Sequence, residues 1–185
     1  AVAAFRTEVP YLERIVAFGN CDAASALALF HTGLPIDRLI LANPWVIETD
    51  SEGNQPTPPS AAAIRARYWA RLKNPRSLID LLSGKINLKK LFGGLARATQ
   101  KEAPTGLAQR IGQALSVSSV PTALLLANRD TTALAFASAW KGSAFDAARE
   151  RSDVQLQALD SASHSFADTD AKAWLREQIE AALTD

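Results

Sequence analysis

Residues 14–27 of the chain read RIVAFGNCDAASAL, a short apolar run followed by a run of small residues. The apolar run is partly β-branched and ends at Gly19, which predicts a buried strand. From Asp22 to His31 the pattern becomes helical. The sequence therefore predicts a sharp turn between a strand and a helix, with the single cysteine of the chain, Cys21, at its tip.

Similar signals recur along the rest of the chain. Apolar runs predict strands at 39–42, 123–127 and 154–159, and helical patterns cover 1–8, 132–140 and 168–183, with Asp168 as an N-cap. The run at 154–159 alternates apolar and polar residues, as an edge strand with one wet face does. Because strands and helices alternate, we predict the α/β class, a parallel sheet flanked by helices.

One long segment interrupts this alternation. We assign residues 1–48 and 116–185 to the α/β core and residues 49–115 to an inserted helical cap. Between residues 64 and 110 there are eleven Lys or Arg against two acidic residues, although the whole chain has a net charge of only +1. Such a basic segment indicates a lid over an anionic substrate, a patch that meets a membrane surface, or the solvated face of amphipathic helices.

Composition excludes several classes of protein. A chain of 185 residues that is 48% apolar with a net charge of +1 is not disordered. One cysteine cannot form an intramolecular disulfide, and with two histidines it argues against a structural zinc site, so we expect no metal and no cofactor. The near-neutral charge and the lack of a stacking-aromatic pattern argue against nucleic-acid binding. No apolar run approaches the ~18 residues of a membrane span.

The expected strand ends carry the residues with chemical potential. Active sites of parallel sheets lie at the carboxyl ends of the strands. Cys21 follows the first expected strand, Asp130 the third and His164 the fourth, which is the nucleophile–acid–histidine order of the α/β-hydrolase fold. In that arrangement Cys21 attacks, His164 is its base and Asp130 orients the histidine. The backbone N–H of Asp22 would be one oxyanion donor.

Each of these residues also has a simpler interpretation. A lone cysteine is often a small buried apolar residue, and Asp130 could only cap the helix that follows it. A nucleophile elbow needs small neighbours, which Gly19 provides, whereas Ala23 replaces the usual second glycine and a cysteine replaces the usual serine. The position of Cys21 at a helix amino end favours the thiolate. His31, at the end of a helix, fits a structural role.

Four short motifs together resemble a known family. GNCDAAS at 19–25, LANPW at 41–45, RDTTA at 129–133 and SHSF at 163–166 resemble the exosortase A system-associated hydrolase 1 family. The resemblance implies a bacterial, cytoplasmic α/β-hydrolase encoded beside exopolysaccharide and exosortase genes. Family members carry an additional amino-terminal portion with the first strands, and this chain has no methionine. We therefore expect those strands, and the second oxyanion donor, to lie upstream of Ala1.

Two functions follow from these observations. The first is a hydrolase that cleaves a small, anionic or neutral, ester or thioester through the triad of Cys21, His164 and Asp130. Dienelactone hydrolases, which also use a cysteine, are more distantly similar. The second is a binding or assembly module without turnover, whose basic cap binds an anionic polysaccharide or lipid. The sequence leaves the oligomeric state open.

Overall fold

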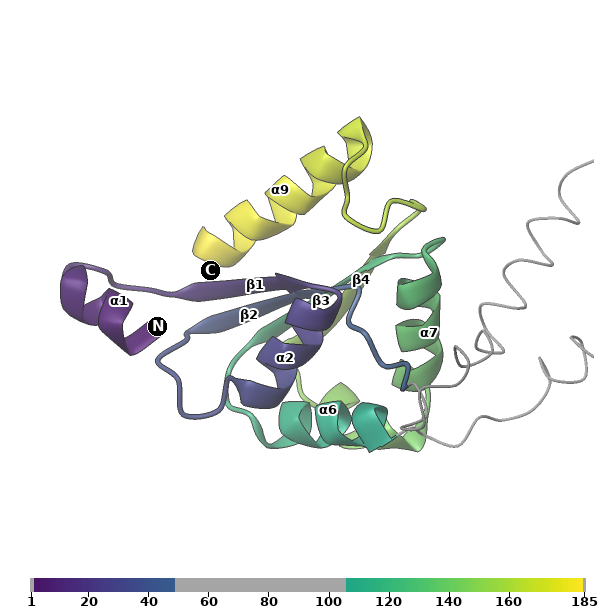
Figure 1. The fold of residues 1–185 in the computed structure, drawn as a ribbon, viewed down its shortest axis with the longest axis horizontal. Coiled ribbons are helices and arrows are strands. Elements are labelled where there is room, and N and C mark those ends of the chain that lie inside the picture. The colour runs from purple at the N-terminus through teal and green to yellow at the C-terminus, as the bar shows by residue number, and fades with distance from the viewer. Residues whose placement is uncertain (1, 49–105, 185) are drawn as a thin grey trace, which may run out of the picture. The chain divides into compact units, whose positions relative to one another are not determined.

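The computed structural model describes residues 2–48 and 106–184, and a parallel sheet is its centre. The strands are β1 (Val16–Asn20), β2 (Arg38–Ala42), β3 (Thr122–Ala127) and β4 (Val154–Leu159). They lie side by side in chain order, and each neighbouring pair is parallel (Figure 1). The prediction of an α/β fold with a parallel sheet is confirmed, and β4 lies at an edge as predicted.

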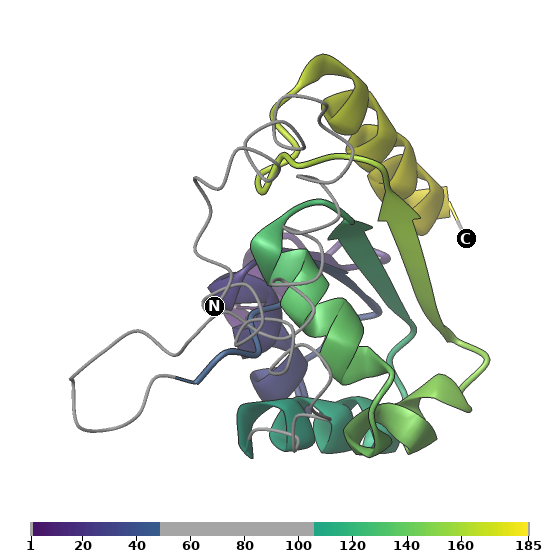
Figure 2. The same ribbon diagram turned by 90° about the vertical axis from the view of Figure 1, so that its right-hand side faces the viewer.

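Helices cover both faces of this sheet. They are α1 (Val2–Glu8), α2 (Asp22–Phe30), α6 (Gly106–Val117), α7 (Thr131–Trp140), the short η1 (Ser143–Phe145) and α8 (Asp146–Arg149), and α9 (Thr169–Thr184). Crossover connections between parallel strands are right-handed. When the strands follow one another across the sheet in chain order, the connecting helices therefore lie on the same face. Accordingly α2 and α6 lie on one side of the sheet and α9 on the other (Figures 1 and 2).

The core divides into two clusters because strand side chains alternate between the faces. Leu41 and Leu124 pack with α2, α6 and α7 in one cluster, whereas Ile40 and Leu125 pack with α9 in the other. The two central strands, β2 and β3, are therefore buried on both faces. This is why their sequences read as continuous apolar runs rather than as alternating ones.

The position of α6 corrects one domain boundary. We assigned residues 106–115 to the inserted cap, but Ala108, Ile111 and Leu115 of α6 are buried in the core cluster of the sheet. The basic count hid this, because Arg110 is the only basic residue on α6, and its apolar face continues the core. The rest of the predicted basic cap, residues 49–105, lies outside the described residues.

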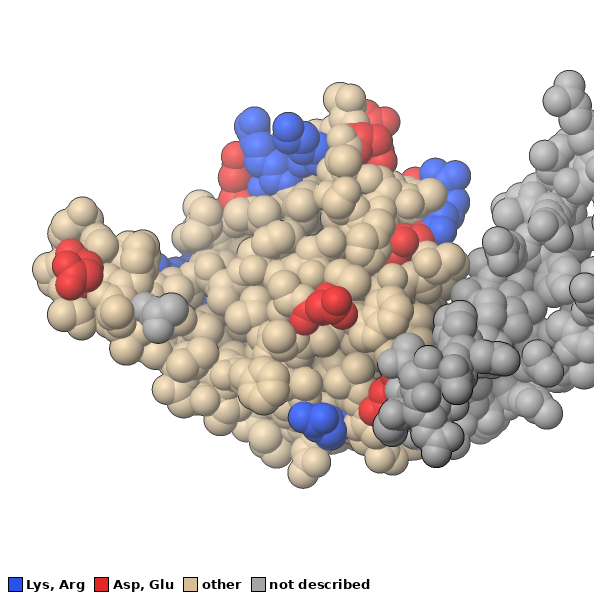
Figure 3. Space-filling model, viewed as in Figure 1, with Lys and Arg blue, Asp and Glu red and all other residues tan. Residues whose placement is uncertain are grey.

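The inserted segment leaves and rejoins the core at one place. The carboxylate of Glu48, the last described residue before the segment, accepts the backbone N–H of Leu107 at 2.6 Å. The described chain on either side of the segment is therefore joined by a hydrogen bond between side chain and backbone. On the face shown in Figure 3, charged side chains are sparse over β1 and α2. The excess of basic residues belongs to the segment and not to the core.

Glycine allows α6 to touch η1 through the backbone. A Cβ atom built on Gly112 would lie 1.9 Å from the carbonyl oxygen of Ala144 and 2.8 Å from its carbon. Neither atom belongs to a side chain that could rotate away. Gly112 is thus required by packing.

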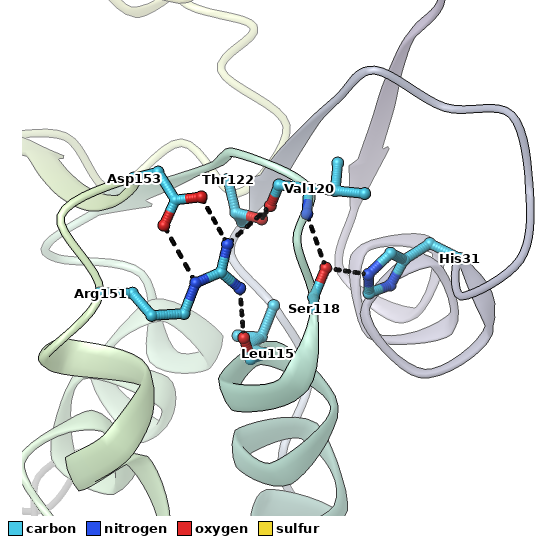
Figure 4. A network of polar contacts seen from close by, with 7 residues as sticks. All are labelled: His31, Leu115, Ser118, Val120, Thr122, Arg151 and Asp153. Atoms are coloured by element: carbon cyan, nitrogen blue, oxygen red, sulfur yellow. Dashed lines mark hydrogen bonds and ion pairs between the residues drawn. The ribbon is translucent and has the colours of Figure 1, made fainter.

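A polar network lies at the amino ends of strands β3 and β4 (Figure 4). The ring of His31 is buried, and its Nδ1 lies 3.0 Å from the carbonyl oxygens of both Leu27 and Ala28, so Nδ1 carries the proton. Nε2 therefore accepts the hydroxyl of Ser118 at 2.6 Å, and Ser118 in turn accepts the N–H of Val120 at 3.0 Å. His31 has the structural role that the sequence indicated.

The same network contains a charged pair. The guanidinium of Arg151 donates to both carboxylate oxygens of Asp153, at 3.0 and 2.6 Å, and to the carbonyls of Leu115 and Val120. The hydrogen bond from Arg151 holds the pKa of Asp153 below its ordinary value. The network joins the carboxyl ends of α2 and α6 to the starts of β3 and β4.

We expect the substitution Gly112→Ala to destabilise the chain by about 3 kcal/mol, at the upper end of overpacking costs, because backbone atoms must move. Urea unfolding followed by circular dichroism measures this change. Gln113→Ala, at an exposed site on the same helix, is the control and should change stability by less than about 0.5 kcal/mol. Helix propensity alone predicts that Gly112→Ala stabilises the chain. That result would contradict the close approach of Gly112 to the backbone of Ala144.

Candidate active site

The parallel sheet brings the ends of its strands to one edge. Cys21 follows β1, Asn43 follows β2, Asp130 lies three residues beyond β3, and His164 lies in the loop after β4. All four strands point the same way, so their carboxyl ends meet at one edge of the sheet (Figure 1). These residues follow those strand ends in the sequence and therefore belong to that edge. Cys21 and His164, more than 140 positions apart in the sequence, thereby lie at the same edge of the sheet.

The backbone at Cys21 has an unusual conformation. Its φ of 57° and ψ of −120° lie in a region that residues other than glycine rarely adopt. Neighbouring elements hold it there: its N–H donates to the carbonyl of Ala42 at 2.9 Å, and its carbonyl accepts the N–H groups of Ser25 and Trp45 at 3.2 and 3.4 Å. The hydroxyl of Ser25 also donates to the carbonyl of Trp45 at 2.6 Å. Cys21 thus stands on a strained turn between β1 and α2.

Gly19 makes this turn sterically possible. A Cβ atom at Gly19 would lie 2.7 Å from the carbonyl carbon and oxygen of Ala23 and 2.8 Å from the nitrogen of Ala24. The first turn of α2 therefore passes directly over the end of β1. Ala23, which replaces the second glycine of the usual motif, is exposed, so its methyl group is accommodated in solvent.

The structure pairs Asp130 with His164. Nδ1 of His164 lies 3.1 Å from Oδ2 of Asp130, whose side chain is 9% exposed against 41% for the histidine. A carboxylate at Nδ1 places the ring proton there and leaves Nε2 as a free acceptor. The same Oδ2 accepts the N–H groups of Thr132 and Ala133, both at 3.0 Å, so Asp130 also caps α7. Asp130 therefore both contacts His164 and caps α7.

Cys21 is not hydrogen-bonded to His164 in the part of the chain that the structure describes. The thiol is partly buried, and the backbone N–H of Asp22, at the start of α2, donates a hydrogen bond to it. The charge of Asp130 is one of the influences that raise the pKa of the thiol, and Asp130 in turn contacts His164. Catalytic hydrogen bonds often tighten only when substrate binds.

The acidity of Cys21 differs from what the sequence indicated. Burial raises the pKa of the thiol above its ordinary value of 9.0. The backbone N–H of Asp22, at the start of α2, opposes this with a hydrogen bond, but the carboxylates of Asp22 and Asp130 raise the pKa further. The amino end of the helix therefore acts as expected but is outweighed, and the resting group is a neutral thiol.

Asn43 is a site residue that the sequence did not single out. It appeared there only within the motif LANPW at 41–45, with no role assigned to it. In the structure it is fully buried, has a φ of 43°, and uses both ends of its amide in hydrogen bonds. The signal in the sequence that could have identified it is the pair Asn43-Pro44, which interrupts a buried apolar run.

The loop that carries His164 is ordered by its serines. The hydroxyl of Ser161 donates to Asp168 at 3.1 Å and accepts the N–H of Ser163 at 3.0 Å. Asp168 accepts the N–H of Ala171 at 2.9 Å, which confirms it as a cap of α9, and this hydrogen bond holds its pKa below the ordinary value. A pocket of about 400 Å³ beside the loop is lined by residues of 159–163 and 168–171 with Arg129, and it does not include Cys21.

Neither a metal centre nor a membrane-spanning helix is found in the described ranges, 2–48 and 106–184. Within them, no three His, Cys, Asp or Glu side chains are grouped so as to hold a metal ion. Nor is any helix of these ranges both long enough and apolar enough to cross a bilayer.

Comparison with known proteins gives a likeness of shape. No protein-family model and no curated protein matches the chain. Among solved structures, the chain is similar to the crystal structure of a hydrolase from Pseudomonas aeruginosa PA01, with 17% sequence identity and a TM-score of 0.48. The match covers 100% of this chain and 69% of that one. Roles for individual residues therefore have to come from the geometry of this chain itself.

Proposed function

We propose that this chain is a hydrolase of the α/β-hydrolase type that cleaves an ester or thioester through an acyl-enzyme on Cys21. The observation that carries the proposal is the strained backbone of Cys21, with a φ of 57° on a turn that only Gly19 permits. Strain of this kind is retained where the surrounding structure enforces it, and it gathers at functional sites. The His164–Asp130 pair at the same edge supplies the matching base.

In the proposed reaction Nε2 of His164 takes the thiol proton while the sulfur of Cys21 attacks the carbonyl carbon of the substrate. The N–H of Asp22 donates to the oxygen that becomes negative. The tetrahedral intermediate collapses, and the imidazolium returns the proton to the departing alcohol or thiol. Water then attacks the acyl-enzyme, with His164 again as base, and releases the acid and the free thiol. Asp130 stabilises the imidazolium throughout.

The raised pKa of Cys21 supports one of two forms of this mechanism. A cysteine with a depressed pKa attacks as a preformed thiolate. Cys21 is a neutral thiol at neutral pH, so its proton must leave during attack, as the hydroxyl proton does in a serine enzyme. The mechanism therefore depends on His164 from the first step.

The biological setting belongs to the same proposal. The motifs around Cys21, Asn43, Asp130 and His164 resemble exosortase A system-associated hydrolases, and on that resemblance we place the enzyme in the cytoplasm beside exopolysaccharide synthesis. A small ester or thioester is the class of substrate that suits a thiol nucleophile.

Replacing Cys21 by alanine should abolish turnover of aryl acetates and acyl thioesters, because the proposed acyl-enzyme forms on the sulfur of Cys21. Rates are followed by release of the aryl alcohol or thiol, and intact mass spectrometry detects the acyl adduct on the wild-type chain. Unfolding in urea checks that the variant is folded. Equal turnover by the two chains rejects the mechanism, and a folded wild-type chain without any turnover favours a binding module.

The two roles of Asp130 can be separated by the choice of substitution. Asp130→Asn keeps an N-cap for α7, so stability should hold, but it loses the charge that stabilises the imidazolium, and kcat should fall about 10³- to 10⁴-fold. Asp130→Ala should lose a similar factor in kcat and also about 1 kcal/mol of stability. Asp160→Asn, at an exposed carboxylate of the same edge, is the matched control. If Asp130→Asn keeps the wild-type kcat, Asp130 serves only as the N-cap of α7 and has no part in catalysis.

The raised pKa predicts how Cys21 reacts with iodoacetamide. Less of the thiol is ionised at a given pH, so alkylation at pH 7.5 should be several times slower than for N-acetylcysteine. The rate should rise with pH to an inflection above 9.0. Asp22→Asn removes one of the carboxylates that raise the pKa and should move the inflection to lower pH. An inflection below that of the free thiol would instead mean a preformed thiolate.

A further inference from the structure

Asn43 occupies a conformation and an environment that both need an explanation. It follows β2 directly, its side chain is 0% exposed, and its φ is 43°. Asparagine enters the left-handed region more readily than most residues, but its amide is costly to bury unless it is hydrogen-bonded. A buried residue of this kind is retained for what its amide holds.

The amide of Asn43 is used at both ends. Its Oδ1 accepts the backbone N–H of Ala127 at 2.9 Å, and its Nδ2 donates to the backbone carbonyl of His164 at 2.8 Å and lies 3.5 Å from Oδ1 of Asn20. An N–H can only donate and a carbonyl can only accept, so the orientation of the amide is fixed by its partners. The side chain therefore bridges the end of β3 to the histidine loop.

The same position reaches the other two site residues through the backbone. The carbonyl of Ala42, the residue before Asn43, accepts the N–H of Cys21 at 2.9 Å. The carbonyl of Ala127, whose N–H the amide holds, accepts the N–H of Asp130 at 2.8 Å. The three candidate catalytic residues are thus each one or two hydrogen bonds from Asn43.

His164 needs this support more than the other two. Cys21 is fixed by α2 and Asp130 by the start of α7, whereas His164 lies in a loop after β4, which is an edge strand. Its ring is 41% exposed and contacts Asp130. The bond from Asn43 connects the backbone of His164 itself to the middle of the sheet edge.

We propose that Asn43 is a positioning residue that holds His164 in register with Asp130 and Cys21 for acyl transfer, an inference that rests on the proposed function. It touches no reacting atom and acts through the backbone of the histidine. Losing it displaces the base without removing any group of the triad, and displacements of about 1 Å cost catalysis on the order of 10²-fold.

Two variants of the full chain test this role. Asn43→Asp keeps the shape and the acceptor for Ala127 but loses the donor to His164, and Asn43→Gly keeps the left-handed backbone but loses the whole amide. Each should lower kcat on an aryl thioester about 10- to 100-fold with KM changed less than twofold. Asn128→Asp is the matched control, since Asn128 is exposed at the same edge, and it should keep the wild-type kcat.

Nuclear magnetic resonance gives a readout that does not need turnover. In the folded variants the ring signals of His164 should shift, because the Nδ1 contact with Asp130 loosens, while those of His31 stay in place. A purely structural role would lower the free energy of unfolding and leave the kcat and the His164 signals of the folded chain unchanged, which would overturn the proposal. Shifted His164 signals in a chain without activity would support the positioning role while the proposed function fails.

The wild-type chain decides the matter if neither variant folds. A through-hydrogen-bond coupling between Nδ2 of Asn43 and the carbonyl carbon of His164 should be measurable. The side-chain amide protons of Asn43 should also exchange with water far more slowly than those of exposed Asn128. Absence of the coupling, with exchange as fast as at Asn128, overturns the proposal.

Discussion

The passage of α2 directly over the end of β1 is the contact on which the site depends. It leaves no room for a side chain at Gly19 and forces Cys21 into a φ of 57°. The energy that holds this strained turn comes from elsewhere, since α2 is packed on the sheet through Ala24 and Ala28. The small residues of α2 and the position of the partly buried thiol at the tip of the turn are therefore two results of one packing requirement.

Much of this fold was predictable, because its signals are local. The runs at 39–42, 123–127 and 154–159 match β2, β3 and β4 within a residue, since buried strands are short apolar runs between turns. The grouping of Cys21, Asp130 and His164 as candidate site residues also follows from local signals. Each of them follows an expected strand, and parallel strands bring their carboxyl ends to one edge whatever lies between them in the sequence. The boundary at 116 was wrong because charge was counted over a window, whereas α6 is placed by its apolar face.

What the sequence could not give depends on partners far along the chain. The pKa of Cys21 is set by burial and in part by Asp130, neither of which is visible in the motif around Cys21. Asn43 bonds to groups 84 and 121 positions away, so its role exists only after the sheet has formed. Asp130 could be assigned two roles from sequence, and the structure shows that one oxygen makes both sets of contacts.

The hydrogen bond between Glu48 and Leu107 also bears on how this chain can change over evolutionary time. A segment whose two ends meet adds to the core only the entropy of closing a loop, which grows slowly with length. Changes in the length of the chain between these two residues therefore cost the core little through loop closure. The sheet and its helices, in residues 2–48 and 106–184, can thus stay the same while the chain between Glu48 and Leu107 changes in length and charge.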